Sequence, residues 1–246
     1  MQKSMFEIVS NGALTENVYK MVLKGDTSPI TAPGQFVNIA LSGLYLRRPI
    51  SVCDVQGDEL TIIYKAVGKG TRQMAQMTKG QLELLTGLGN GYDLSKAGDA
   101  PVLLGGGVGV PPMYLLAKEL VNMGKNVRVI LGFNTKSEVF YQEEFKDLGC
   151  EVTVTTVDGS YGLRGFVTDA LKEMDYSYFY TCGPEPMLKA VYRASKTSGQ
   201  MSFEKRMGCG FGACMGCSCK TITGYKRICK EGPVMRKEEI LWENLA

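Results

Sequence analysis

The sequence predicts an antiparallel β-barrel, then a parallel α/β domain, then a cysteine-rich loop region. Three observations support this fold class. Residues 1–98 contain short apolar segments separated by turn residues, residues 99–199 alternate strand-like and helix-like segments, and residues 200–246 hold five of the eight cysteines. A chain of 246 residues can build one large hydrophobic core or two modest ones.

The first region is predicted to form a small barrel. Short strands at regular spacing with turn residues between them are typical of this architecture. One helical segment, residues 71–77, interrupts the series. The expected strands span residues 5–9, 18–23, 35–41, 50–55, 60–67 and 82–86.

The second region changes to an alternation of strands and helices near Ala100, which indicates a parallel sheet with crossover helices. Residues 197–202 are interpreted as a linker to the loop-like tail, which is too short of apolar runs to build a core of its own. The expected strands span 102–104, 127–131, 152–157 and 178–181, and the expected helices span 111–123, 138–147, 167–173 and 185–196.

Composition excludes several classes of protein. The chain has no histidine, which excludes Ser-His-Asp and Cys-His catalysis and histidine-ligated metals. A net charge of only +3 gives no electrostatic footprint for nucleic acid or for an anionic membrane. Residues 1–20 do not resemble a secretory or transit segment. We therefore expect a cytoplasmic protein whose clustered cysteines bind a metal rather than form disulfides.

The cysteine spacing predicts an iron-sulfur site. Cys209, Cys214 and Cys217 are separated by four and two residues, and Cys229 follows after eleven more. This pattern is typical of plant-type [2Fe-2S] ligation. A zinc site is the alternative, although a zinc ribbon needs two Cys-x2-Cys pairs and this chain offers one. Cys219 is interpreted as a bystander, and a ligand exchange with Cys217 stays open.

Two motifs in the first region together predict a flavin dinucleotide site. Four residues at a strand start combine a guanidinium, a rigid proline and a hydroxyl, which suits a pyrophosphate and the edge of a flavin ring; they are Arg48, Pro49, Ile50 and Ser51. Gly70 and Thr71 lie at a helix start, where free N–H groups and the helix dipole favour phosphate. Taken alone, the first motif is also compatible with an exposed pair of strand-edge arginines.

Two further motifs run from strand to helix in the second region. The first is glycine-rich and allows a ligand close to the backbone; it contains Gly105, Gly106, Gly107 and Gly109. The second contains Cys182, Gly183 and Pro184 and is expected beside the first at the carboxyl edge of the sheet, where cofactors bind. Neither is the G-x-G-x-x-G fingerprint, so a Rossmann dehydrogenase is not expected.

The order RPIS, GKGT, GGGVGVPP and CGPEPM resembles the ferredoxin-NADP reductase superfamily, and the added CGFGACMGC loop is similar to the electron transfer subunits of NAD-dependent (type B) dihydroorotate dehydrogenases. The resemblance implies FAD, a [2Fe-2S] cluster and NAD as cofactors. It implies an FMN-containing catalytic subunit as partner, in a heterotetramer of two of each chain. It also implies electron transfer from that FMN to NAD+ in pyrimidine biosynthesis.

The same resemblance assigns residues to roles. Ile63, Tyr64 and Lys65 would line the flavin, beside residues 48–51, and residues 70 and 71 would hold its pyrophosphate. The two strand-to-helix motifs would bind the nicotinamide nucleotide, with Cys182 near the transferred hydride. Four cysteines would hold the cluster: Cys209, Cys214, Cys217 and Cys229. No residue here is expected to catalyse dihydroorotate oxidation, which the family assigns to the partner.

Two alternatives stay open at this point. The chain could serve another flavin and iron-sulfur complex, such as a ferredoxin-NADP transhydrogenase, a sulfide dehydrogenase or a hydrogenase. It could instead be a non-catalytic protein with a four-cysteine zinc or redox-sensing site. Stoichiometric bound FAD would exclude the second alternative.

Overall fold

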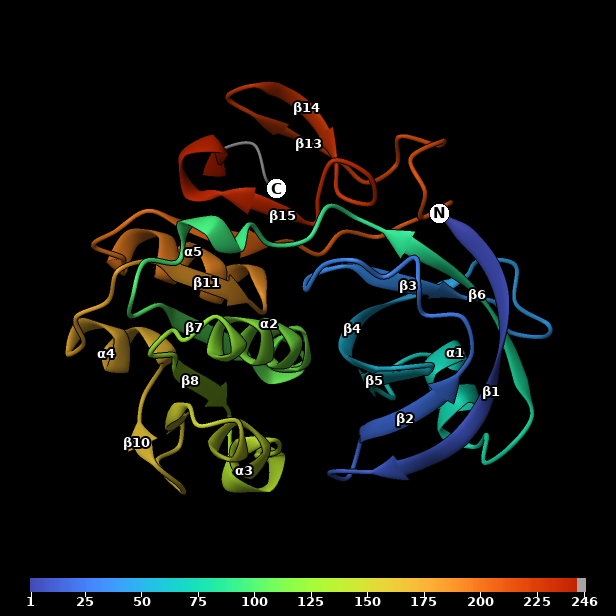
Figure 1. Ribbon diagram of the computed structural model, residues 1–246, viewed down its shortest axis with the longest axis horizontal. Coiled ribbons are helices and arrows are strands. Elements are labelled where there is room, and N and C mark those ends of the chain that lie inside the picture. The colour runs from blue at the N-terminus through green and yellow to red at the C-terminus, as the bar shows by residue number, and fades with distance from the viewer. Residues whose placement is uncertain (243–246) are drawn as a thin grey trace.

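The computed structural model describes residues 1–242 and consists of a barrel beside an α/β domain, with the C-terminal segment lying along one side of both (Figure 1). Within these residues, none of the helices is both long and apolar enough to span a bilayer. The division at residues 98 and 199 remains a prediction.

The barrel confirms the fold expected for the first region. Its strands close in the order β1-β2-β5-β4-β3-β6, and the short helix α1 (Lys69–Ala75) follows β5. The strands are β1 (Gln2–Ala13), β2 (Val18–Lys24), β3 (Phe36–Ile39), β4 (Arg48–Gln56), β5 (Glu59–Lys65) and β6 (Gln81–Leu88).

Strand β1 is much longer than the expected residues 5–9 because it serves two neighbours. Its first half, Gln2 to Glu7, pairs with β6, and its second half, Glu7 to Ala13, pairs with β2. The outer face of β1 is exposed, so its polar ends gave no apolar signal in the sequence. This double pairing closes the barrel.

The second domain is built on a seven-stranded sheet in the order β10-β9-β8-β7-β11-β12-β15, parallel except for β15. Its strands are β7 (Val102–Gly106), β8 (Arg128–Phe133), β9 (Glu151–Thr156), β10 (Leu163–Arg164), β11 (Phe179–Cys182), β12 (Gly199–Ser202) and β15 (Val234–Arg236). Its helices are α2 (Pro111–Asn122), α3 (Gln142–Asp147), α4 (Val167–Lys172) and α5 (Glu185–Ala194).

The linker interpretation of residues 197–202 is wrong. All four residues of β12 are buried, and the strand pairs with β11 on one side and β15 on the other. A Cβ on Gly199 would lie 2.2 Å from the Phe179 ring, so only glycine lets the two strands meet at this point. The composition was loop-like because close packing requires glycine at position 199, and because the buried Gln200 finds its hydrogen-bond partners in a distant segment.

The expected helix over residues 138–147 is also wrong in its first half. A 3₁₀ turn, Lys136–Glu138, is followed by extended chain, and α3 begins only after Tyr141. Tyr141 has φ +66°, a left-handed conformation that interrupts any helix. The apolar residues in this segment are apolar because Phe140 and Tyr141 are buried, not because the segment is helical.

The tail contains more regular structure than expected. Strands β13 (Ser218–Thr221) and β14 (Gly224–Arg227) form a hairpin beyond the sheet (Figure 1). Cys217, Ile228 and Cys229 join a hydrophobic cluster with residues of β7, β11 and β12. The tail thus shares the core of the α/β domain, and Trp242 packs against the rings of Tyr192 and Phe203.

The two domains contact each other closely. Helix α2 packs against β4, and Lys118 Nζ lies 2.8 Å from Asp54 Oδ1 across the boundary. Barrel residues Cys53 and Ile63 belong to the same buried cluster as Leu103 of β7. The loop after β7 and the end of β8 also face the barrel, because Gly107, Val108 and Phe133 line one hollow together with Lys65.

Candidate functional site

The four cysteines with cluster spacing lie in two pairs. Cys217 Sγ and Cys229 Sγ are 3.2 Å apart, and the Cys229 N–H donates to Cys217 Sγ at 3.4 Å. The Cys214 N–H donates to Cys209 Sγ at 3.4 Å, and the Cys209 N–H donates to Cys214 Sγ at 3.5 Å. Since a [2Fe-2S] cluster takes four thiolates, two on each iron, the paired arrangement fits it.

The loop backbone favours thiolate ligands. Burial alone would raise the pKa of the Cys209 thiol, but hydrogen bonds from backbone N–H groups, including that of Ala213 at 3.2 Å, lower it to about 6. Thiolate is the form that ligates metal. A Cβ on Gly208 would lie 3.2 Å from Cys214 Sγ, so glycine keeps that sulfur uncovered.

The two cysteine pairs are not gathered around a single point. Among residues 1–242, no three cysteine or carboxylate side chains are gathered closely enough to hold one metal ion. Cys219 lies apart on β13, where its Sγ contacts the Lys226 carbonyl at 3.5 Å and burial raises its pKa. The bystander interpretation of Cys219 stays a prediction.

The two barrel motifs meet in space. Gly70 is buried against the Arg48 guanidinium, and a Cβ on Gly70 would lie 2.1 Å from Arg48 Nε. Thr71 Oγ1 accepts hydrogen bonds from the N–H groups of Val67 and Gly68, both at 3.1 Å. The Thr71 hydroxyl therefore caps the loop before α1, while Arg48 and the Gly70 backbone form a cradle whose role in holding a pyrophosphate stays a prediction.

The three predicted flavin-lining residues of β5 face different surroundings. Tyr64 is 2% exposed, belongs to the barrel core, and donates from its hydroxyl to Asn11 Oδ1 at 3.0 Å. Ile63 is buried in the cluster shared by both domains. Lys65, at the strand end, lines a hollow together with Gly107 and Val108 of the α/β domain. Ile63 and Lys65 thus lie at the domain junction, whereas Tyr64 lies inside the barrel.

The two strand-to-helix motifs of the α/β domain also meet, as expected. Gly105 and Cys182 are register partners on β7 and β11. A Cβ on Gly109 would lie 2.2 Å from the Cys182 carbonyl oxygen, and a Cβ on Gly106 would lie 2.3 Å from Met187 Sδ. Burial, and then the nearby Glu204 carboxylate, raise the pKa of the Cys182 thiol to about 12. Cys182 therefore stays neutral at the carboxyl edge of the sheet.

Gly109→Ala is expected to weaken nicotinamide nucleotide binding. The new methyl group meets backbone atoms of residues 182 and 183, which cannot rotate away, so the two loops must separate at a cost of about 1–3 kcal/mol. We expect KM for NADH to rise about tenfold or more, with FAD and iron content unchanged. Gly12→Ala is the control, because a Cβ there meets nothing within 4 Å. An unchanged KM would contradict the assignment.

Sequence reasoning missed residues that support these motifs. Asn11 donates to the carbonyls of Met74 and Met77, both at 2.9 Å, and so ties Tyr64 to the end of α1. Arg227 donates to the Gly212 carbonyl at 2.5 Å and pairs with Glu231. Nothing in the sequence marked either contact, because Arg227 ends strand β14 and Glu231 lies in the turn that follows, where the four-residue spacing of helices does not apply.

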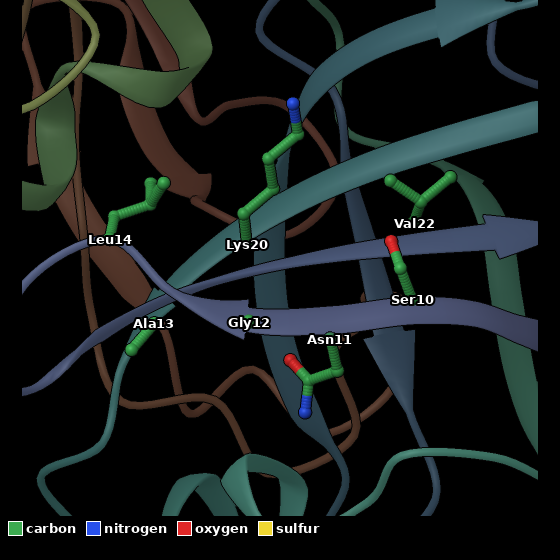
Figure 2. A pocket seen from close by; sticks show the side chains of 7 residues that line it. All are labelled: Ser10, Asn11, Gly12, Ala13, Leu14, Lys20 and Val22. Atoms are coloured by element: carbon green, nitrogen blue, oxygen red, sulfur yellow. The ribbon is translucent and has the colours of Figure 1, made fainter.

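A second hollow lies on the barrel between β1 and β2 (Figure 2). Asn11 and Lys20 extend to opposite sides of these strands, and Lys20 reaches over the Tyr141 ring of the α/β domain. None of the predicted site residues lines this hollow. Its lining consists of Ser10, Asn11, Gly12, Ala13, Leu14, Lys20 and Val22.

Two family models match the chain. Residues 204–241 match the iron-sulfur cluster binding domain of dihydroorotate dehydrogenase B. Residues 103–193 match the oxidoreductase NAD-binding domain. The first match contains all four predicted cluster ligands, and the second contains both strand-to-helix motifs.

Solved structures share all or most of this architecture. A NADH-dependent reduced ferredoxin-NADP oxidoreductase, studied for flavin-based electron bifurcation, superposes with a TM-score of 0.87 at 29% identity, covering 97% of this chain and 90% of that chain. A ferredoxin NADP+ reductase from Neisseria gonorrhoeae, solved with FAD and NADP, gives a TM-score of 0.70 at 17% identity, covering 79% of this chain and 90% of that chain. The second likeness concerns the fold alone.

Relatives at higher identity extend over nearly the full length. The electron transfer subunit of dihydroorotate dehydrogenase B (NAD+) from Bacillus pumilus is 42% identical, with 98% of each chain covered. The subunit of the same name from Fusobacterium nucleatum is 43% identical, covering 95% of this chain and 96% of its own. This chain therefore belongs to the family of electron transfer subunits of dihydroorotate dehydrogenase B (NAD+).

Proposed function

We propose that this chain carries electrons from the FMN of a dihydroorotate dehydrogenase catalytic subunit to NAD+, in pyrimidine biosynthesis. The observation that carries the proposal is the placement of three binding motifs in one molecule: the paired cysteines, the Arg48 and Gly70 cradle, and the joined loops at Gly109 and Cys182.

A bound [2Fe-2S] cluster would supply single-electron chemistry, and a bound FAD would supply the link between single electrons and the hydride that NAD+ accepts. Cys209, Cys214, Cys217 and Cys229 hold the cluster, and the loop N–H groups stabilise the thiolate charge.

Arg48 and the backbone at Gly70 hold the FAD pyrophosphate, next to Pro49, Ile50 and Ser51 on the same strand. Lys65 lies where the barrel meets the first glycine loop, and so lines the junction between flavin and nicotinamide. The joined loops place the nicotinamide nucleotide against the carboxyl edge of the sheet; they comprise Gly105, Gly106, Gly107, Gly109, Cys182, Gly183 and Pro184.

The oxidation of dihydroorotate itself belongs to the partner. That step needs a base beside a substrate pocket, and the motifs of this chain supply phosphate-binding and thiolate groups instead. We infer an FMN-containing catalytic subunit in a heterotetramer of two of each chain. We place the complex in the cytoplasm, a reducing compartment in which the free cysteines of this chain persist.

A second candidate is a sister complex with another electron donor or acceptor. The likeness at a TM-score of 0.87 to the ferredoxin-NADP oxidoreductase favours it, because the same fold occurs there in a protein named for a different reaction. The FAD and cluster motifs do not separate the two candidates, whereas the partner does.

The deciding experiment captures the tagged chain anaerobically from its native lysate and measures dihydroorotate-dependent NADH formation. Activity with a co-purifying FMN protein is the expected result. The isolated chain, loaded with FAD, is expected to oxidise NADH with an artificial acceptor and to leave dihydroorotate unchanged. NADH oxidation with a different co-purifying partner would overturn the dihydroorotate assignment and favour the sister complex.

A further inference from the structure

A barrel asparagine reaches the cysteine loop. Asn38 lies on β3, is 1% exposed, and donates from its side-chain Nδ2 to the Cys209 carbonyl at 3.1 Å. The two residues are 171 positions apart in the sequence. A buried side chain of the flavin domain is therefore hydrogen-bonded to the backbone of the first cluster ligand.

The backbone of Asn38 contacts the strand that carries the flavin motif. Asn38 is the register partner of Pro49 on β4. Arg47, the residue before the motif, donates to the Asn38 carbonyl at 3.3 Å and is paired with Glu83 of β6. One residue thus joins the strand that carries the predicted flavin contacts to the loop that carries the cluster ligands.

Both partners of this contact, Asn38 and the loop backbone at Gly210, have features that the contact requires. Gly210 has φ +76°, and a Cβ there would lie 2.2 Å from Asn38 Nδ2, so only glycine admits the asparagine. The Asn38 Oδ1 atom is buried with no hydrogen-bond partner among residues 1–242. Leaving a buried amide oxygen unpaired is costly, and leucine or valine would fill the position on β3 at no such cost.

We propose that Asn38 is a positioning residue that fixes the cluster loop at one distance from the flavin strand. Electron transfer between two cofactors slows steeply as they separate, so a rigid link between their binding elements sets the rate. This inference rests on the proposed function, since it assumes that both cofactors bind. It adds a role for a residue that contacts neither the sulfurs nor the Arg48 cradle.

Two variants break the contact from opposite sides. Asn38→Asp removes the N–H donor and places a carboxylate against the Cys209 carbonyl, whereas Gly210→Ala pushes the asparagine away. Asn90→Asp is the control for the first, because Asn90 donates to the Val234 carbonyl at 2.8 Å and also joins the barrel to the C-terminal region. Gly124→Ala is the control for the second, with a matching φ of +74° and open space.

The experiment uses the full chain loaded with FAD and cluster, mixed rapidly with NADH without oxygen. Flavin absorbance follows the hydride step, and freeze-quenched electron paramagnetic resonance follows reduction of the cluster. In both variants we expect the rate of the hydride step to be unchanged and the rate of flavin-to-cluster electron transfer to fall about tenfold or more. Both controls should match the wild type.

A second readout needs no cofactor. Phe211 lies in the same loop and is 41% exposed, so chymotrypsin can cleave after it. The rate of this cleavage measures how often the loop opens. Loss of one hydrogen bond predicts about fivefold faster cleavage of the cluster-free Asn38→Asp chain. If that variant does not fold, Asn38→Ser and Gly210→Ala provide the same comparison.

The outcomes separate the two claims. A wild-type chain that binds neither FAD nor an iron-sulfur cluster would refute the proposed function. A loaded wild type, with wild-type transfer and cleavage rates in both variants, would overturn the role of Asn38 alone. Loss of the cluster itself in both variants would also overturn the positioning role, because the contact would then be needed for binding.

Discussion

Cys214→Ser is expected to abolish the cluster and, with it, dihydroorotate-dependent reduction of NAD+ in the complex. Cys214 and Cys209 form one of the two sulfur pairs, and each receives a hydrogen bond from the other's N–H group. A serine hydroxyl is a poor substitute for a soft thiolate ligand of iron. Coupled activity should fall more than about a hundredfold, because a chain that lacks one of four cluster ligands no longer holds the cluster.

Three measurements check this result: iron and sulfide content, the visible spectrum before and after dithionite, and NADH formation with the partner present. FAD content and NADH oxidation by an artificial acceptor should be retained, because the Arg48 cradle is built from the barrel. Cys219→Ser is the matched control, since that thiol contacts the Lys226 carbonyl instead. Coupled activity at the wild-type level in Cys214→Ser would refute the ligand assignment.

Arg48→Ala is expected to weaken FAD binding by roughly tenfold to a hundredfold, the range for loss of a charge-assisted hydrogen bond. The Arg48 guanidinium lies against the buried Gly70 backbone, so its removal opens the cradle as well as deleting a positive charge. Flavin retained after dialysis measures the effect directly, and a titration of the flavin-free protein gives the affinity.

The cluster should be retained in Arg48→Ala, because the cysteine loop contacts the barrel through Asn38 rather than through Arg48. Arg193→Ala serves as the control, since Arg193 is exposed near the end of α5, in the other domain. Full flavin occupancy in Arg48→Ala after dialysis would count against the site formed by the two barrel motifs.

Local patterns in the sequence were sufficient for much of the fold, and they also predict the binding motifs. The regular short strands predicted the barrel, and the strand and helix alternation predicted the parallel sheet. The spacing of Cys209, Cys214 and Cys217 predicted the cluster loop, which the family match at residues 204–241 supports. These features depend on residues that are close in the sequence, so a local sequence pattern is enough to predict them.

The strand β12 shows where such patterns fail. Its sequence, GQMS, was interpreted as a linker, yet Gln200 is buried and satisfied by contacts with distant residues. Its amide accepts from the Asp93 N–H at 2.8 Å and donates to the Asp93 carbonyl at 2.9 Å. A polar residue can occupy a buried strand when its partners come from another segment, and no local pattern reports them.

Residue type and short spacing predict which residues hold phosphate, nicotinamide and iron, because local chemistry is enough for that prediction. The tertiary structure alone decided which of them meet. Arg48 packs on Gly70, Gly109 on Cys182, and Asn38 on the cysteine loop. Each contact joins segments that are distant in sequence, and strand register together with close glycine packing fixes it.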